Sequence, residues 1–216
     1  MKIKGAIFDF DGTLFDSMSI WETAGEDYLR SINRTPKDNL RQILKSMSLL
    51  QSAQFLKTEY GLPQTVDEII KGINQTVANF YFNQAMPKEN VVAFLDVLKS
   101  KEVKMCIATA TDHYLVEAAL KRCHMLHYFE NIFTCSEVGY GKDHPYIYNH
   151  AVAFLQTNMS ETAVFEDAYY AAKTAKLAGF KLVGIYDEYE PQQNELKEIS
   201  DIYLTDFLLE GETLWT

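Results

Sequence analysis

Short apolar runs rich in β-branched residues recur along this chain, and from Val103 onward they alternate with stretches of helical periodicity. The runs predict strands over 3–10, 103–109, 131–135, 163–166, 181–186 and 199–204, and the stretches between them predict helices over 114–125, 145–156 and 169–178. Strands that alternate with helices are typical of a parallel sheet covered by helices on both faces. The run over 181–186 is apolar almost throughout, as a strand buried on both faces should be. We therefore expect an α/β fold.

A long segment with no convincing strand interrupts this alternation after the first strand. From Asp16 to Met86, about 70 residues carry helical periodicity, which is more chain than one crossover helix uses. An Asn-Arg-Thr-Pro stretch at 33–36 and a Gly-Leu-Pro stretch at 61–63 divide it into helices near 17–32, 38–58 and 65–84. We expect two domains: an α/β core of residues 1–15 and 88–216, and an all-helical insertion at 16–87.

Composition excludes several classes of protein. The chain has 20 Lys+Arg against 30 Asp+Glu, a net charge of −10, and it has no basic run, which argues against a nucleic-acid partner. An apolar N-terminal stretch is cut by Asp9 before a signal-peptide core could form, and no stretch approaches the length of a membrane span. The three cysteines have spacings that fit neither a zinc site nor a disulfide framework. We expect a cytoplasmic protein, a monomer or homodimer, with neither nucleic acid nor a membrane as partner.

Two carboxylates, Asp9 and Asp11, follow the first expected strand, and Gly12 then permits the chain to turn. Open α/β sheets bind ligands at the carboxyl ends of their strands, so this is the place for a site. If the strand geometry persists, both side chains project to the same side, where two carboxylates repel each other unless a cation lies between them. Mg²⁺ prefers such oxygen ligands. The alternative interpretation is that the two residues only cap a turn, as Asp-Gly pairs often do.

The string Asp-Phe-Asp-Gly-Thr-Leu-Phe-Asp-Ser at 9–17 resembles the first motif of the haloacid dehalogenase superfamily of phosphotransferases. The later motifs of that superfamily resemble, in order, Thr109 at the end of an apolar run, Lys142 before Pro145, and the acidic pair Glu166 and Asp167. Three positions depart from the usual pattern: Asp143 replaces the proline after the lysine, and Ala168 and Ala171 replace the serine and glycine after the acidic pair. The resemblance implies a Rossmann-like core, and it implies that the insertion is a helical cap like that of the phosphoglycolate phosphatase and β-phosphoglucomutase branch.

The resemblance also implies a role for each matched residue. Asp9 attacks phosphorus and becomes an aspartyl phosphate, while Asp11 acts first as general acid and then as general base. Lys142, the hydroxyl of Thr109 and nearby backbone N–H groups stabilise the transferring group, with Gly12 and Ala110 as further substrate-binding positions. Mg²⁺ is held by a carboxylate oxygen of Asp9, the backbone carbonyl of Asp11 and Asp167, with Glu166 acting directly or through water.

These roles predict a Mg²⁺-dependent phosphatase that hydrolyses a small phosphomonoester, such as a sugar phosphate, a nucleotide or a similar metabolite, through an aspartyl phosphate. A dehalogenase is disfavoured because that branch lacks a carboxylate at the position of Asp11. One alternative is a phosphohexomutase like β-phosphoglucomutase, but Leu49 stands where the mutases carry an arginine that grips a second phosphate, in a segment, 44–50, that resembles their cap loop. A further alternative is a non-catalytic protein that binds a phosphorylated ligand.

The insertion offers weaker indications. Trp21 and Met47 are apolar candidates for substrate contacts in a lid over the site. The competing interpretation is that both belong to the core of the insertion.

Overall fold

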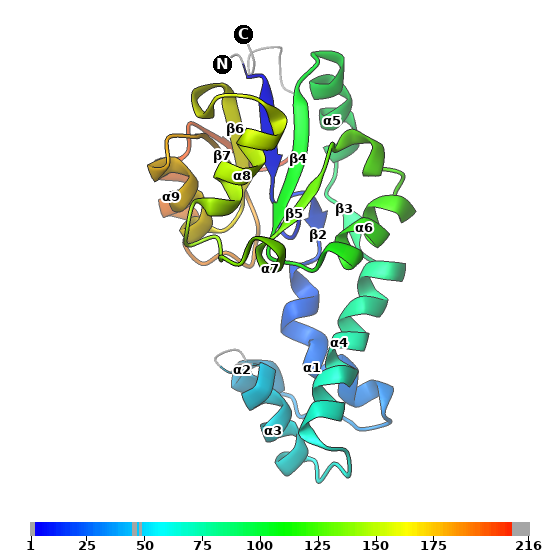
Figure 1. The fold of residues 1–216 in the computed structure, drawn as a ribbon. Coiled ribbons are helices and arrows are strands. Elements are labelled where there is room, and N and C mark those ends of the chain that lie inside the picture. Colours follow the sequence, from blue (N-terminus) through cyan, green and yellow to red (C-terminus); the bar gives the residue numbers. More distant parts are fainter. Residues whose placement is uncertain (1–2, 45–46, 48, 209–216) are drawn as a thin grey trace. The chain divides into compact units, whose positions relative to one another are not determined.

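The computed structural model describes residues 3–44, 47 and 49–208. They form two compact units (Figure 1), an α/β unit of Met1–Asp16 with Ala85–Thr216 and a helical unit of Ser17–Gln84. Among the described residues, no helix is both long enough and apolar enough to cross a membrane.

The α/β unit is built on a six-stranded parallel sheet with the strand order β5-β4-β1-β6-β7-β8. Its strands are β1 (Gly5–Phe8), β4 (Lys104–Thr109), β5 (Ile132–Thr134), β6 (Thr162–Glu166), β7 (Lys181–Ile185) and β8 (Ile202–Leu204). Each lies within a run expected to be a strand or extends one residue beyond it. The last run is shorter than expected, because Ile199 ends a helix and the strand begins only at Ile202.

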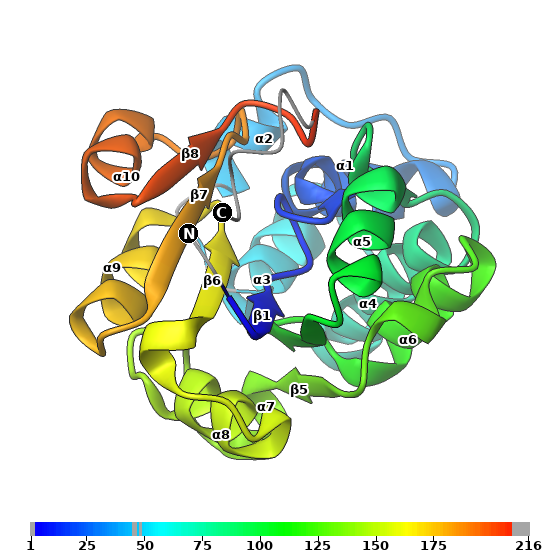
Figure 2. The same ribbon diagram turned by 90° about the horizontal axis from the view of Figure 1, so that it is seen from above.

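Helices cover both faces of this sheet (Figure 2), which confirms the predicted fold class. They are α5 (Val91–Ser100), α6 (His113–Arg122), α7 (Cys135–Val138), α8 (Tyr146–Leu155), α9 (Tyr169–Leu177) and α10 (Gln193–Ile199), with short 3-10 helices at Leu126–Tyr128 and Met159–Glu161. Of these, α5, α7 and α10 were not expected from the sequence. The apolar residues of α5 recur at helical spacing and could have indicated it, whereas α7 and α10 are short.

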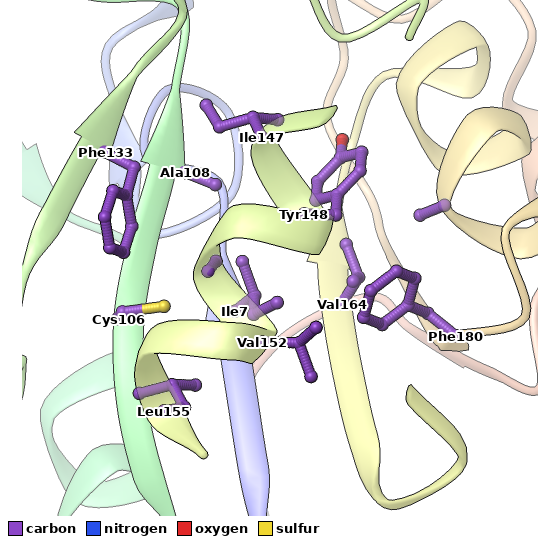
Figure 3. Close-up of a cluster of buried hydrophobic side chains, with 12 residues drawn as sticks. Ile7, Cys106, Ala108, Phe133, Ile147, Tyr148, Val152, Leu155, Val164 and Phe180 are labelled. Carbon is purple, nitrogen blue, oxygen red and sulfur yellow. The ribbon is translucent and has the colours of Figure 1, made fainter. Parts of the chain in front are cut away.

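The register of the strands explains why each face is apolar. Ile7 of β1 pairs with Cys106 and Val164 on the neighbouring strands. Residues paired in this way point to the same face of the sheet, and the next residue along each strand points to the opposite face. Figure 3 shows this buried face packed against α8, through residues such as Val152 and Leu155.

The opposite face carries aromatic rings. Phe8 stacks on Phe165 of β6 with ring centroids 4.2 Å apart. Phe94 of α5 meets Phe165 edge to face at 5.7 Å and also contacts Phe207. Such pairs hold α5 against the sheet. Both faces of β1 are therefore fully buried. Packing on both sides holds in place the strand that leads into the first motif.

The helical unit contains α1 (Met18–Ser31), α2 (Leu40–Leu44), α3 (Leu49–Glu59) and α4 (Val66–Asn83), and its described residues include no strand. The prediction of a single helix over 38–58 is wrong, because the chain bends at Met47 between α2 and α3. No proline or glycine in this part of the sequence indicates a break. A capping box between Thr65 and Glu68 begins α4. Gly72 allows the Tyr28 ring of α1 to lie against α4, because an added Cβ would fall 2.2 Å from it.

The two ends of the inserted segment are paired with each other. β2 (Phe15–Asp16) and β3 (Met86–Pro87) form a two-stranded antiparallel sheet within the α/β unit. The backbone N–H of Lys88 also donates to the carbonyl of Leu14 at 2.9 Å. The chain thus leaves and re-enters the α/β unit at neighbouring points.

Candidate active site

The first motif forms a tight loop directly beyond β1. The strand ends at Phe8, and the N–H of Asp9 donates to the carbonyl of Phe165 at 2.9 Å. Gly12 then adopts a φ of 74°, a region that glycine enters without steric cost, and its N–H donates to the carbonyl of Phe15 at 2.9 Å. The strand geometry therefore does not persist through the motif: the backbone N–H of Asp9 still bonds to β6, whereas the chain turns at Gly12.

Sheet order brings the other motifs to the same edge. β4 and β6 flank β1, so Thr109 at the end of β4 and Glu166 at the end of β6 lie on either side of the Asp9 loop. Parallel strands all end at one edge of a sheet, which is where ligands of open α/β folds bind. Lys142 comes from the loop between α7 and α8.

Lys142 is a buried cation that joins two carboxylates. Its side chain is 4% exposed, and Nζ donates to Asp9 Oδ1 and, at 2.7 Å, to Glu166 Oε1. A buried ammonium persists only where it is paired, so these contacts hold all three side chains in place. Burial lowers the pKa of Lys142, but the charges of Asp9 and Glu166 outweigh burial and raise the pKa above its ordinary value.

Three carboxylates gather at this point. Asp9, Glu166 and Asp167 offer carboxylate oxygens that lie within 4.8 Å of one another, and all three residues are buried. The hydroxyl of Tyr148 on α8 donates to Glu166 Oε1 at 2.8 Å, and the hydroxyl of Thr13 donates to Asp167 Oδ1 at 2.8 Å. Within the described part of the chain, Glu166 Oε2 is buried and has no hydrogen-bond partner.

The electrostatics of the cluster favour an added positive charge. Burial raises the pKa of Glu166 to about 7, against the opposing effect of Lys142 and with a further rise from Asp9. Burial, then Asp9 and Glu166, hold the pKa of Asp167 well above its usual range. A divalent cation would offset this repulsion. Hard carboxylate ligands and an unpartnered buried oxygen fit such an ion, so these residues are suited to hold Mg²⁺.

Asp11 has a different environment from Asp9. Its carboxylate is not part of the three-carboxylate cluster, and its Oδ2 accepts a hydrogen bond of 2.6 Å from the hydroxyl of Thr111. The N–H of Thr111 donates in turn to Thr109 Oγ1 at 3.0 Å. The segment after β4 thus links the second motif to the first.

Three buried hydroxyls in this site, those of Thr13, Thr111 and Tyr148, were not singled out from the sequence. Each binds a carboxylate of a motif residue, and the partners of Thr13 and Thr111 are 154 and 100 residues away. Two positions offered a signal, since Thr13 lies inside the string at 9–17 and Thr111 is two residues beyond Thr109.

The predicted substrate-binding residues are divided between the two units. Gly12 is buried in the turn and Ala110 is exposed just beyond β4. Trp21 and Met47 belong to the helical unit, where Trp21 is 49% exposed with its ring 6.5 Å from that of Tyr81, and Met47 is half-buried.

The segment 44–50, compared above with the mutase loop, is only partly described. Lys45, Ser46 and Ser48 lie outside the described residues. Leu49 is the first residue of α3 and is 42% exposed.

A cavity of about 380 Å³ lies elsewhere on the α/β unit. Its walls come from the segments at the two ends of the insertion, at Asp16 and 86–89, and from the residues at the ends of β7 and β8. They include Lys88, Asp187 and Asp206. None of the predicted site residues lines it. Lys88, the cation in its lining, is bound to the Asp187 carboxylate at 2.8 Å.

Comparison with known proteins establishes the family. A model of the haloacid dehalogenase-like hydrolases matches residues 3–179, and the chain belongs to this family. A phosphorylated carbohydrates phosphatase of Thermotoga maritima is 22% identical over 181 residues, which cover 84% of each chain. A validoxylamine A 7'-phosphate phosphatase of Streptomyces hygroscopicus subsp. limoneus is 25% identical over 193 residues, which cover 88% of each chain.

The fold is shared with solved structures as well. A candidate β-phosphoglucomutase from Thermotoga maritima superposes with a TM-score of 0.83 over 94% of both chains, at 21% sequence identity. The predicted superfamily is thus confirmed, and so is the predicted class of enzyme, a phosphoric monoester hydrolase.

Proposed function

We propose that this protein is a Mg²⁺-dependent phosphatase that hydrolyses a small phosphomonoester through an aspartyl phosphate on Asp9. The observation that carries the proposal is the buried cluster in which Lys142 joins Asp9 to Glu166 while Asp167 lies within reach of both. An anionic nucleophile attacks a dianionic ester only where positive charge offsets the repulsion and the reactants are held in line.

In the first step, a carboxylate oxygen of Asp9 attacks phosphorus and the bond from phosphorus to the substrate oxygen breaks. Asp11, protonated, gives its proton to the departing oxygen, so that an alcohol leaves and an aspartyl phosphate remains.

In the second step, the carboxylate of Asp11 takes a proton from a water molecule whose oxygen attacks phosphorus. The bond from phosphorus to Asp9 breaks, which releases inorganic phosphate and restores the Asp9 carboxylate. The proton now on Asp11 serves the next turnover.

The surroundings of Asp9 supply the charge and the hydrogen bonds. Lys142 places its ammonium beside the nucleophile, and Thr109 can donate its hydroxyl hydrogen to an equatorial phosphoryl oxygen. Asp9, Asp167 and Glu166, with the backbone carbonyl of Asp11, would hold the ion. When bound, Mg²⁺ supplies Lewis-acid stabilisation of the phosphoryl oxygens.

The proposed substrate is a small phosphorylated metabolite. The relative from Thermotoga maritima, named as a phosphatase of phosphorylated carbohydrates, favours sugar phosphates. The proposed role of the helical segment 16–87 is that of a cap that excludes water and recognises the leaving alcohol, with Trp21 and Met47 among its contacts. We propose a cytoplasmic monomer or homodimer, and the free thiols of Cys106, Cys123 and Cys135 accord with a reducing compartment.

Phosphate release tests this proposal. Wild type, Asp9→Asn and the matched control Asp38→Asn, which changes an exposed aspartate of the helical unit, are assayed on sugar phosphates, nucleotides and small phosphoesters. We expect release by wild type and Asp38→Asn with Mg²⁺, and loss of release with EDTA or in Asp9→Asn. Release that survives in Asp9→Asn would contradict the proposal. Conversion of β-glucose 1-phosphate without net release of phosphate would establish the phosphohexomutase alternative. No phosphate release and no conversion of β-glucose 1-phosphate would favour the non-catalytic alternative.

A further inference from the structure

Thr111 occupies an unusual position between two motif residues. It lies just beyond β4, is 6% exposed, and uses both of its hydrogen-bond donors inside the site. Its hydroxyl donates to Asp11 Oδ2 at 2.6 Å, and its N–H donates to Thr109 Oγ1 at 3.0 Å.

We propose that Thr111 is a positioning residue that orients the Asp11 carboxyl for proton transfer to the leaving group. The inference rests on the acid–base role of Asp11 in the proposed function. A carboxyl on a short side chain can rotate about its Cβ–Cγ bond, and a bond from a hydroxyl to one of its oxygens fixes the plane of the group. A distance of 2.6 Å is typical of a strong bond from a hydroxyl to a carboxylate.

The second hydrogen bond of Thr111, from its N–H to Thr109, affects the hydroxyl of Thr109. The hydroxyl of Thr109 accepts the N–H of Thr111 with a lone pair, which keeps its own hydrogen available for a phosphoryl oxygen. One residue therefore sets the orientation of the acid relative to the hydroxyl that binds the transferring group. Burial matters here, since the bond between Thr111 and Asp11 is buried and a water molecule does not readily take the place of a buried hydroxyl.

Loss of the bond from Thr111 to Asp11 should slow the first step most for substrates whose leaving group is most basic, because a basic leaving group departs slowly unless it is protonated. A 4-nitrophenolate leaves well without a proton, whereas a 4-methoxyphenolate is more basic and depends on the acid. A change that only loosens the fold slows both reactions to the same extent, so the dependence of the rate on the leaving group separates positioning from structure.

The experiment measures pre-steady-state release of phenol from 4-nitrophenyl, phenyl and 4-methoxyphenyl phosphate with Mg²⁺, because this phase reports the first step alone. Thr111→Val removes the hydroxyl at nearly constant volume, Thr111→Ala is a second deletion in case the valine variant folds poorly, and Thr111→Ser keeps a hydroxyl. Thr162→Val is a matched control, since Thr162 is also buried and hydrogen-bonded but lies at the opposite end of β6 from Glu166.

We expect Thr111→Val to slow release from 4-methoxyphenyl phosphate about 10- to 100-fold and from 4-nitrophenyl phosphate less than about threefold, part of the usual contribution of a general acid. Thr111→Ser should restore the wild-type dependence, and Thr162→Val should not alter it. Equal slowing of all three esters in the deletion variants, or a serine variant like the valine variant, overturns this inference while the proposed function stands. A wild type that releases neither phenol nor phosphate, here and in the metabolite panel, overturns both.

Discussion

Tyr148 shows how a single hydroxyl supports the carboxylate cluster of the candidate site. Glu166 is fully buried, and its Oε1 accepts from both Lys142 and Tyr148. A buried carboxylate is stable only if donors replace the water it has lost, so each of the two bonds stabilises the folded chain.

Tyr148→Phe removes one of these donors and leaves the ring in place. We expect a loss of about 1.5–3 kcal/mol in the free energy of unfolding, the range for hydrogen bonds to charged groups. Urea denaturation measures it. Tyr146→Phe is the matched control, because Tyr146 lies in the same helix and is 44% exposed. If the two variants were equally stable, the Tyr148 hydroxyl would not support Glu166.

At the scale of residues, motif resemblance identified the groups with distinctive neighbours in the sequence. Asp9, Glu166 and Lys142 come together in the structure from three separate segments. Thr111 and Tyr148 escaped notice because a threonine after a strand or a tyrosine in a helix is ordinary by itself. Their importance depends on the partner that the fold brings to them.

Among the elements, the edge between β7 and β8 is strengthened by one side chain. Asp201 extends the pairing of the two strands, since its N–H donates to the carbonyl of Leu182 at 2.9 Å and its Oδ2 accepts the N–H of Leu182 at 2.7 Å. Lys176 of α9 donates to Oδ1 of the same carboxylate at 2.6 Å. One aspartate thus fastens a helix and two strands together.

This carboxylate makes a pH-dependent contribution to stability. Burial acts to raise the pKa of Asp201, but the bonds from Lys176 and Leu182 outweigh it and the pKa is lowered from its ordinary value. A group with a lowered pKa in the folded state stabilises the fold above its unfolded pKa, about 3.9, and loses that contribution as the pH falls through the folded pKa.

We therefore expect Asp201→Asn to be less stable than wild type at pH 7, by less than about 1 kcal/mol for a pair this exposed. The difference should shrink below about pH 4. Urea denaturation at several pH values measures it. A difference that grew toward low pH would contradict the assignment.

Elements were predictable where burial imposes a continuous apolar pattern, as in β1, β6 and β7. The division of α2 from α3 was not, because no breaker residue stands between them. Likewise, a short helix such as α10 has too few turns to show a period.

At the scale of the whole molecule, the buried carboxylate cluster couples ligand binding to folding. An ion that binds the native cluster and not the unfolded chain stabilises the fold by mass action, by about 2.7 kcal/mol at 100 times its Kd. The three carboxylates come from the end of β6 and from the loops that follow β1 and β6, so they are assembled only when the sheet is formed.

We expect Mg²⁺ to raise the unfolding temperature of wild type by several degrees relative to EDTA, as measured by calorimetry. Asp167→Asn should lose most of this shift, and Asp38→Asn should keep it. Sodium chloride at equal ionic strength controls for general screening. An equal shift in wild type and Asp167→Asn would show that the ion binds elsewhere.

The pairing of β2 with β3 also bears on how such a protein changes over generations. Because the two ends of the inserted segment are fixed side by side, a recombination event that replaces it leaves the surrounding chain with the same two anchor points. The entropy of closing such a loop grows only slowly with its length, so segments of very different size are tolerated at this place. Under the proposed function, in which the inserted segment recognises the substrate, substrate preference can therefore diverge by exchange of whole gene segments while the residues around Asp9 are inherited unchanged.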